Sequence, residues 1–277
     1  MAEAWRRSQV AGHFGELMQG RLGPNGPVTL VTLPCPTHLA TVRWHPHGSF
    51  HVHSPQRLLN RRTFASVFQA LGQIPRGRVI ANCTMPAGGG AGASTATILA
   101  LINVLAGKEL TPDEVAQVCV AIEGACDPLM HETPDQYLWA SRHGVRLGEL
   151  PPVPSFDFIG GFDGDGIRTD AMDTNFADIA DLIPKWIAAC GANDLRAAGD
   201  VAQASADRNA ALRGGPSIGA LKHLAQQMHA VAVVVAHTGS ARGLMFPPGA
   251  IPRSAPAALR SIGLRQICQF RSRRIAR

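Results

Sequence analysis

The sequence predicts a protein of the α+β class in two halves, and three observations carry that prediction. Short β-branched runs are interspersed with segments of helical periodicity along the chain. A glycine-rich stretch, residues 84–107 (TMPAGGGAGASTATILALINVLAG), joins a predicted strand to an apolar helix. Prolines at 151, 152 and 154 then interrupt the pattern. We therefore place a domain boundary near residue 150, which gives domains of residues 1–150 and 151–277.

The elements before the glycine-rich stretch follow from local patterns. Residues 28–33 (VTLVTL) are apolar and β-branched, and Pro27 and Pro34 bound them, so they are predicted to form the first strand. Apolar side chains in residues 61–71 have helical spacing. Further strands are predicted over residues 39–44, 49–53 and 78–84.

Two helices are predicted after the glycine-rich stretch. Residues 98–105 are almost all apolar, which predicts a buried helix that ends at Gly107. The next helix has a strong start signal, because Thr111 can cap it, Pro112 suits its first turn and Glu114 completes a capping box.

The second half repeats the mixture of strands and helices. Strands are predicted over residues 156–159, 231–236 and 243–246, with a turn before the last of them. Helices are predicted over residues 178–189, 194–212 and 217–228. The last 25 or so residues either complete a sheet of this half or form a basic tail.

The composition indicates a globular chain that binds neither nucleic acid nor membrane. Of its 277 residues 45% are hydrophobic and 17% charged, and the net charge is +6. The basic residues are mostly scattered arginines, and one tyrosine with no clustered phenylalanines gives no stacking platform for bases. No apolar run is long enough to span a bilayer, and the N-terminus lacks the apolar core of a signal peptide. We therefore expect a cytoplasmic protein.

The cysteines and histidines do not predict a metal site. The six cysteines have irregular spacings and no CxxC pair, which favours reduced, buried thiols over a disulfide framework or a zinc site. His51 and His53 would share one face of a strand, but no cysteine or aspartate stands at a ligand spacing from them. They are predicted to be surface histidines.

The glycine-rich stretch is predicted to cradle phosphate. A linker would have polar flanks, whereas this stretch lies between a strand and a buried helix. Glycines let backbone N–H groups approach a ligand, and a helix N-terminus favours anions. No lysine follows the last glycine, so this is not a Walker loop. Ser94 and Thr95 begin the helix, where their hydroxyls could cap it, bind phosphate or bind magnesium.

Residues 86–96 (PAGGGAGASTA) resemble the second motif of the GHMP kinases, the superfamily of galacto-, homoserine, mevalonate and phosphomevalonate kinases. That motif is P-x-x-x-G-L-G-S-S-A, and this chain matches it at Pro86, Gly90, Gly92 and Ser94. Ala91 replaces the leucine, and Ala93 replaces the first serine.

Three other stretches resemble the L-threonine kinases of this superfamily, which are linked to cobalamin synthesis and propanediol utilisation. Residues 11–20 (AGHFGELMQG) resemble their G-E-L-x-Q-G motif. Residues 122–130 (IEGACDPLM) resemble E-P-[ST]-D-x-x-M, and residues 233–246 (VVVAHTGSARGLMF) resemble V-A-H-[ST]-G-[TS]-x-x-G-L. The resemblance therefore spans residues 11 to about 246, with its motifs in the same order.

The resemblance implies a fold and an activity. The fold would have an N-terminal half like domain 2 of ribosomal protein S5 and a ferredoxin-like C-terminal half, with ATP between them. The reaction would be the Mg²⁺-dependent transfer of phosphate from ATP to L-threonine. Its product, O-phospho-L-threonine, would supply the side chain of cobalamin.

The resemblance also implies the site. The ATP cradle would consist of Pro86, Gly88, Gly89, Gly90, Gly92, Ser94 and Thr95. Ser94 and Glu123 would hold Mg²⁺. Asp127 would accept the substrate's proton or orient its hydroxyl, with Asp135 as the second choice. The small-molecule acceptor would be bound by Glu16, His237, Gly239 and Arg242, with Glu16 at the ammonium and Arg242 at a carboxylate or phosphate.

Two other functions stay open. The chain could phosphorylate homoserine or another small alcohol. It could also be a nucleotide- or metabolite-binding regulator that has kept the fold without catalysis, since Ala91 and Ala93 depart from the motif. The sequence leaves the oligomeric state open, and an oligomer is possible.

Overall fold

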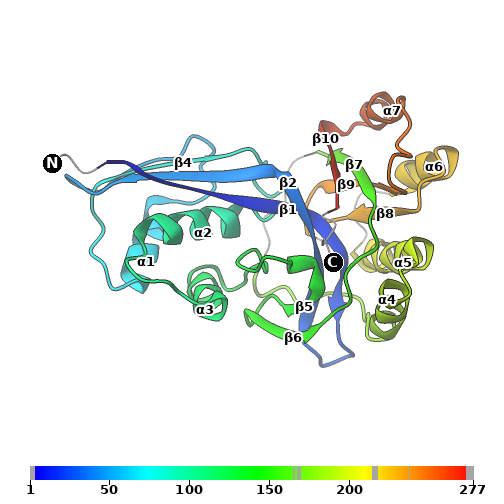
Figure 1. Cartoon of the computed structure of the whole chain (residues 1–277), viewed down its shortest axis with the longest axis horizontal. Coiled ribbons are helices and arrows are strands. Elements are labelled where there is room, and N and C mark those ends of the chain that lie inside the picture. Colours follow the sequence, from blue (N-terminus) through cyan, green and yellow to red (C-terminus); the bar gives the residue numbers. More distant parts are fainter. Residues whose placement is uncertain (1–3, 165, 167–169, 214–217, 237, 273–277) are drawn as a thin grey trace.

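One mixed sheet connects the two halves of the chain in the computed structural model (Figure 1). The structure describes residues 4–164, 166, 170–213, 218–236 and 238–272, and in these ranges ten strands form the sheet. Eight of them follow the order β10-β7-β9-β8-β1-β2-β4-β3, while β5 pairs with β2 and β6 pairs with β5. Within the sheet, the strands of the two halves pair at β1 and β8, through Glu16 and Val235. Since both halves contribute to one sheet, the division at residue 150 stays a prediction.

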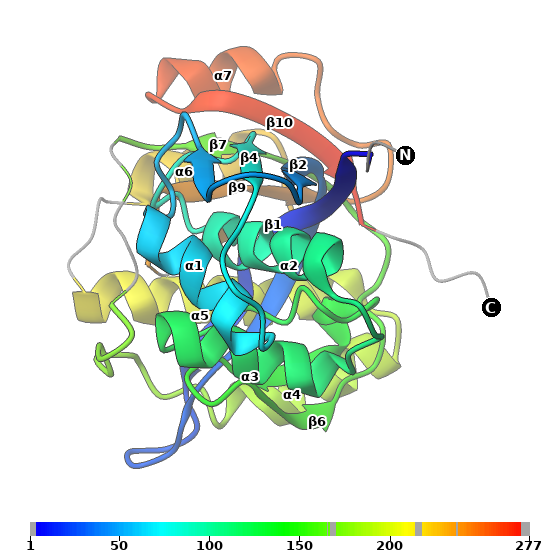
Figure 2. The same ribbon diagram turned by 90° about the vertical axis from the view of Figure 1, so that its left-hand side faces the viewer.

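The first half has six strands, three α-helices and one short 3-10 helix (Pro134–Gln136) among the described residues. Its strands are β1 (Arg6–Arg21), β2 (Val28–His45), β3 (His51–His53), β4 (Arg78–Cys83), β5 (Tyr137–Ala140) and β6 (Val145–Glu149). Its helices are α1 (Arg61–Ala70), α2 (Ala93–Leu105) and α3 (Pro112–Glu123). Figure 2 looks onto these three helices, which lie together in front of the sheet. Their apolar faces share one core cluster with β2 and β4.

The longest strands differ most from the sequence prediction. β1 was not predicted, and the two strands predicted over residues 28–33 and 39–44 are parts of β2. Pro34 and Pro36 lie inside β2, where a proline removes a ladder hydrogen bond. The strand accommodates them because its pairing with β1 changes register on both sides of His13.

The predicted helix signals of the first half are confirmed. Thr111 accepts a hydrogen bond from the backbone N–H of Glu114, and the Glu114 side chain accepts one from the backbone of Thr111, so the capping box at the start of α3 is complete. α2 is buried almost all round, as its uniform apolarity predicts. His51 and His53 are exposed on β3.

The second half packs helices against the remaining strands. Its strands are β7 (Asp157–Phe162), β8 (Ala232–Val235), β9 (Ala241–Phe246) and β10 (Arg265–Arg271). Its helices are α4 (Leu182–Gly191), α5 (Leu195–Arg213), α6 (Gly219–Gln227) and α7 (Ala255–Ser261). β9 begins at Ala241, inside the predicted turn. The end of the chain was predicted either to complete a sheet or to form a basic tail. Up to Arg271 it completes the sheet, because β10 pairs with β7.

Two further observations concern predictions made from composition. The six cysteines are free thiols, and all but Cys268 are buried, as predicted. No helix in the described ranges combines the length and the apolarity that a membrane crossing needs.

Candidate active site

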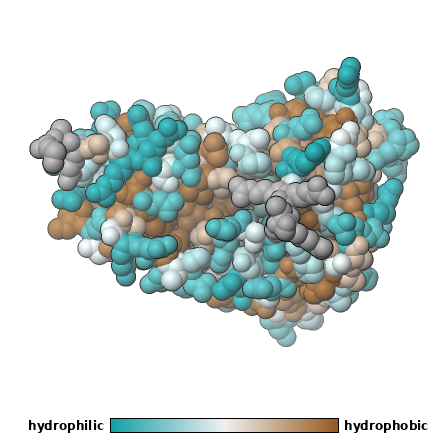
Figure 3. All heavy atoms as spheres, in the orientation of Figure 1, coloured by the Kyte–Doolittle hydropathy of each residue, from teal (hydrophilic) through white to brown (hydrophobic). Residues whose placement is uncertain are grey.

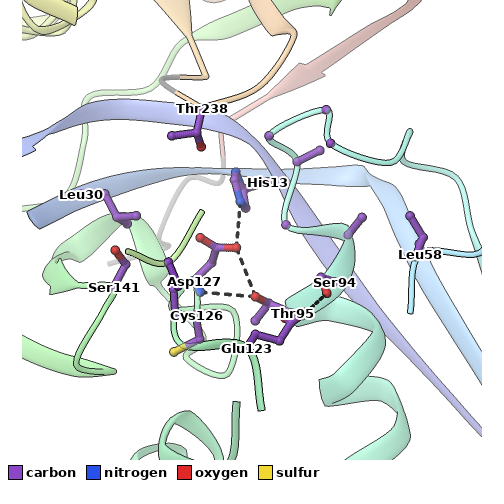
Figure 4. Close-up of a pocket in the computed structure, with 18 of the residues that line it drawn as sticks. His13, Leu30, Leu58, Ser94, Thr95, Glu123, Cys126, Asp127, Ser141 and Thr238 are labelled. Carbon is purple, nitrogen blue, oxygen red and sulfur yellow. Dashed lines mark hydrogen bonds and ion pairs between the residues drawn. The ribbon is translucent and has the colours of Figure 1, made fainter. Parts of the chain in front are cut away.

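A cavity of about 330 Å³ lies where the glycine-rich loop, β1 and the turn after α3 meet (Figure 4). The space-filling view shows the molecular surface notched between the α1–α3 part and the α4–α7 part (Figure 3). Most of the predicted site residues line this cavity: Glu16, Pro86, Gly88, Gly89, Gly90, Gly92, Ser94, Thr95, Glu123 and Asp127. Segments more than 100 residues apart in the sequence therefore contribute to one site.

The backbone of the glycine-rich loop is anchored on its carbonyl side. The carbonyl of Gly89 accepts a hydrogen bond from Ala241 of β9, at 2.8 Å. The carbonyls of Gly90 and Ala91 accept hydrogen bonds from Gly15 and His13 of β1, each at 3.0 Å. Because the C=O and N–H of one planar trans peptide point in opposite directions, the N–H groups that follow these carbonyls point away from the strands.

The loop's conformation suits an anion. Gly88, Gly90 and Gly92 have φ of 67°, 69° and 68°, and such alternation of left-handed residues is typical of anion-binding nests. Gly92 is the N-cap of α2 and has no side chain to cap it, so the first turn of the helix keeps its N–H groups for a ligand. The prediction of a phosphate cradle fits this geometry.

Two neighbouring hydroxyls of α2 bind two carboxylates. The Ser94 hydroxyl donates to Oε1 of Glu123, at the end of α3. The Thr95 hydroxyl donates to Oδ2 of Asp127, at 3.3 Å, in the turn that follows α3 (Figure 4). Ser94 and Glu123 supply only oxygen donors beside the anion cradle, and a hydroxyl with a carboxylate is the kind of ligand set that Mg²⁺ accepts.

His13 lies between two carboxylates at the wall of the cavity. Its Nε2 is 3.2 Å from Oδ2 of Asp127, and its Nδ1 is 3.2 Å from the carbonyl oxygen of Gly15 and 3.9 Å from Oε1 of Glu16. Both ring nitrogens face oxygen acceptors, so both must carry protons. His13 is therefore an imidazolium, although its side chain is only 2% exposed.

The pKa values of the pair follow from this contact. Burial alone would lower the pKa of His13, but the charge and hydrogen bond of Asp127 and the charge of Glu16 raise it to about 9. Burial alone would raise the pKa of Asp127, but the charge and hydrogen bond of His13, with the Thr95 hydroxyl, hold it below its usual value. Asp127 is thus an anion with a fixed cationic partner.

A second set of polar groups, from Gln19, Ser141 and Arg142, lines the same cavity. The Gln19 side-chain oxygen, the Ser141 hydroxyl and Nε of Arg142 are buried and have no hydrogen-bond partner within the described ranges. Arg142 also donates to the carbonyl oxygen of Asp170, at 3.2 Å, which fixes its position. Buried polar atoms without partners are rare in native proteins, so these groups indicate a polar ligand in this cavity.

Of the remaining predicted substrate-binding residues, Gly239 and Arg242 are not among those that line this cavity. Gly239 packs against the loop, because a Cβ there would come within 2.4 Å of the backbone nitrogen of Gly90. Arg242 does not line the cavity, and its guanidinium pairs with Asp163 at 3.2 Å. His237 lies outside the described residues. Asp135, the second choice of base, lines another cavity.

Sequence reasoning missed two charged groups of the cavity. His13 falls inside a motif stretch, but its pairing with Asp127 depends on how β1 meets the turn after α3. Arg142 has no sequence signal at all, since the residues around it match none of the motifs.

Comparisons with known proteins bear on the fold. No protein-family model matches the chain, and no curated protein matches it in sequence. Among solved structures, phosphomevalonate kinase from Streptococcus pneumoniae matches with a TM-score of 0.67 and 10% identity, over 97% of this chain and 100% of that one. Homoserine kinase from Cytophaga hutchinsonii matches with a TM-score of 0.64 and 13% identity, over 96% and 94%.

The chain has the fold of the GHMP kinases. This confirms the overall fold that the motif resemblance implied, while the ribosomal-S5-like half and the ferredoxin-like half stay a prediction. The fold also occurs with another reaction, because mevalonate pyrophosphate decarboxylase from Streptococcus pyogenes matches with a TM-score of 0.66 and 11% identity, over 100% and 99%. The activity must therefore be argued from the site.

Proposed function

We propose that the chain is an ATP-dependent kinase that phosphorylates the hydroxyl of a small amino acid, with L-threonine as the first candidate. One observation carries the proposal. A single cavity brings together an anion-binding glycine loop, a hydroxyl–carboxylate pair and an aspartate held by a cation. Phosphoryl transfer to an alcohol needs these parts, because positioning and charge neutralisation dominate its catalysis.

The triphosphate of ATP is proposed to lie on the glycine loop and the first turn of α2. The uncapped N-terminus at Gly92 and the left-handed glycines at 88 and 90 support this assignment. The Streptococcus pneumoniae phosphomevalonate kinase of the same fold has also been solved in complex with phosphomevalonate and AMPPNP, an ATP analogue.

Ser94 and Glu123 are proposed to hold Mg²⁺. Their oxygen atoms fit a hard divalent cation. Ser94 lies in the first turn of α2, which would face the phosphates, and Glu123 reaches it from the end of α3. When bound, the ion neutralises charge on the transferring phosphate. The Ser94 hydroxyl donates a hydrogen bond to Glu123 in the structure, so the two oxygen atoms already lie side by side.

Asp127 is proposed to orient the acceptor hydroxyl and to take its proton late in the transfer. Its lowered pKa makes it a weak base, which suits a loose transition state that needs little proton abstraction in advance. His13 holds the carboxylate in place from the side opposite Thr95 (Figure 4).

The charged groups of the acceptor are proposed from two other residues that line the cavity, Glu16 and Arg142. Glu16 can bind an ammonium, and Arg142 can bind a carboxylate through charge-assisted hydrogen bonds. An amino acid carries both groups. The choice of L-threonine depends on the motif resemblance, and homoserine is the alternative, since homoserine kinase shares the fold. The link to cobalamin synthesis belongs to the same proposal.

The test is ADP release by the purified chain with Mg-ATP and a panel of acceptors: L-threonine, L-serine, L-homoserine, mevalonate, galactose and none. We expect turnover with L-threonine. Asp127→Asn should lower kcat by at least about 100-fold if the carboxylate handles the proton. Asp135→Asn is the matched control and should leave kcat unchanged, because Asp135 faces a different cavity.

The outcomes separate the alternatives. Turnover with another alcohol keeps the kinase and replaces the substrate. ATP binding without turnover of any acceptor favours the regulator. Loss of activity in Asp135→Asn but not in Asp127→Asn would exchange the roles of the two aspartates.

A further inference from the structure

A second cluster of donor side chains lies outside the proposed active site. The ligand atoms of Cys35, His38 and Cys268 all lie within 4.8 Å of one another. Cys35 and His38 belong to β2, while Cys268 belongs to β10, the strand at the end of the sheet beyond β7 (Figure 1). The cluster therefore joins the two halves of the chain and uses neither the glycine loop nor Asp127.

His38 has a buried polar atom without a partner. Its side chain is 7% exposed, and Nε2 makes no hydrogen bond to any described residue. The ring stacks on Phe14 and tilts against Phe162, with 5.6 Å between ring centroids in each pair. An imidazole held this firmly, with an unpaired nitrogen and two thiols nearby, indicates a missing ligand.

Cys35 lies in a segment that suits a metal ligand. Pro34 and Pro36 flank it and cannot donate ladder hydrogen bonds, and the register of β2 on β1 shifts here. The hydrogen bond from the Cys268 thiol, followed by those from the Thr37 hydroxyl and nearby backbone, lowers the pKa of Cys35 to about 7. The same contact raises the pKa of Cys268. Metal ions bind cysteine as the thiolate, so the position of Cys35 beside Cys268 and His38 suits a metal ligand.

We propose that Cys35, His38 and Cys268 form a zinc site that fastens β10 to β2. Two thiolates and one imidazole are a donor set that zinc prefers, whereas Mg²⁺ prefers oxygen. Donor atoms around a tetrahedral zinc ion lie roughly 3.3–3.8 Å apart, so small side-chain rotations close the set. Cys35 also lines the second cavity, of about 590 Å³.

The site is independent of the proposed kinase activity, and zinc binding tests it directly. The full chain is purified under reducing conditions and treated with a chelator. Zn²⁺ is then titrated by calorimetry, and Co²⁺ serves as a spectroscopic probe for thiolate ligands. We expect one ion per chain, with thiolate-to-cobalt charge-transfer absorption and a higher melting temperature in zinc.

Variants identify the ligands. Cys35→Ser, Cys268→Ser and His38→Ala should each weaken zinc binding at least tenfold. Cys190→Ser removes another buried thiol and should leave the affinity unchanged. His38→Cys replaces the imidazole by another zinc ligand and should keep binding, even if His38→Ala is unstable.

Three results would overturn the proposal. One is a Cys35–Cys268 disulfide in the freshly isolated protein, detected by mass after alkylation. Another is the absence of zinc binding by the reduced chain. The third is zinc binding that survives Cys35→Ser and Cys268→Ser but is lost in Glu16→Gln, which would place the ion at the His13, Glu16 and Asp127 group instead.

Discussion

The imidazolium of His13 lies against the carboxylate of Asp127, with Nε2 and Oδ2 3.2 Å apart. His13 comes from β1, and Asp127 comes from the turn after α3, so the pair forms only when the chain is folded. Its energy therefore depends on the protonation of the histidine in the folded and unfolded states.

The first prediction concerns stability against pH. The pKa of His13 is about 9 in the folded chain, against 6.5 for an unperturbed histidine in the unfolded chain. The stability that protonated His13 contributes is therefore complete below pH 6.5, and it is lost as the pH rises to about 9. The free energy of unfolding of the wild type should fall across this window more steeply than that of His13→Gln. Urea denaturation at several pH values measures both. If the free energies of unfolding of the two proteins change in parallel with pH, His13 is not protonated as described.

The second prediction concerns the metal ligands. Glu123→Gln should weaken the apparent affinity for Mg²⁺ by at least about tenfold, since even partners outside a metal's ligand set change affinity by about 10- to 100-fold. Glu114→Gln is the control, because Glu114 caps the other end of α3. It should lower the melting temperature without changing the Mg²⁺ dependence of turnover. Equal Mg²⁺ dependence in the two variants would exclude Glu123 as a ligand.

The third prediction concerns the loop. In Gly90→Ala the new Cβ would stand 2.4 Å from that of Ala236, at a φ of 69°, and we expect a loss of about 1–3 kcal/mol in stability with weaker ATP binding. Gly107→Ala should change neither, because no atom outside its neighbours lies within 4 Å of that position. Thermal melting and nucleotide titration of both variants provide the comparison.

The fourth prediction separates two arginines. Arg142→Met should raise the KM for the amino acid by roughly 10- to 100-fold, the value of a charge-assisted hydrogen bond of about 1.5–3 kcal/mol. The KM for ATP should not change. Arg146→Met is the control, since Arg146 is 41% exposed and lies on β6. If Arg242→Met raises the acceptor KM and Arg142→Met does not, the sequence-based assignment of Arg242 holds.

Local signals in the sequence were sufficient for several parts of the fold. The capping box at Thr111 and the uniform apolarity of α2 are decided within a few residues, so they could be predicted. The glycine loop could also be predicted, because its left-handed turns at Gly88, Gly90 and Gly92 favour glycine at fixed spacings.

β1 could not be predicted because it does not look like a strand. Its middle is buried on both sides, but it contains His13, Glu16 and Gln19, which are buried to build the cavity. Polar residues at buried positions remove the alternation by which a half-buried strand is found. β2 was divided in error for a related reason, since two prolines inside a strand are tolerated only where the pairing is irregular.

Partners distant in the sequence were beyond prediction. Arg242 was assigned to substrate from its motif, but its partner Asp163 is fixed by the pairing of β7 with β9. The expectation of no zinc site considered spacings within the sequence. Spacings could not show that Cys268 lies close to Cys35, because β10 brings them together from opposite ends of the chain.

The glycine loop is held by main-chain hydrogen bonds from β1 and β9 before any nucleotide arrives. Ordering a backbone costs about 1–2 kcal/mol per residue in conformational entropy. Here the loop is ordered when the chain folds, so ligand binding does not have to order it. A nucleotide bound there, as we propose, would keep nearly the full benefit of its contacts, because the loop is preorganised. Since main-chain N–H groups would make the proposed contacts to phosphate, alanine at 91 and 93 would leave the cradle intact.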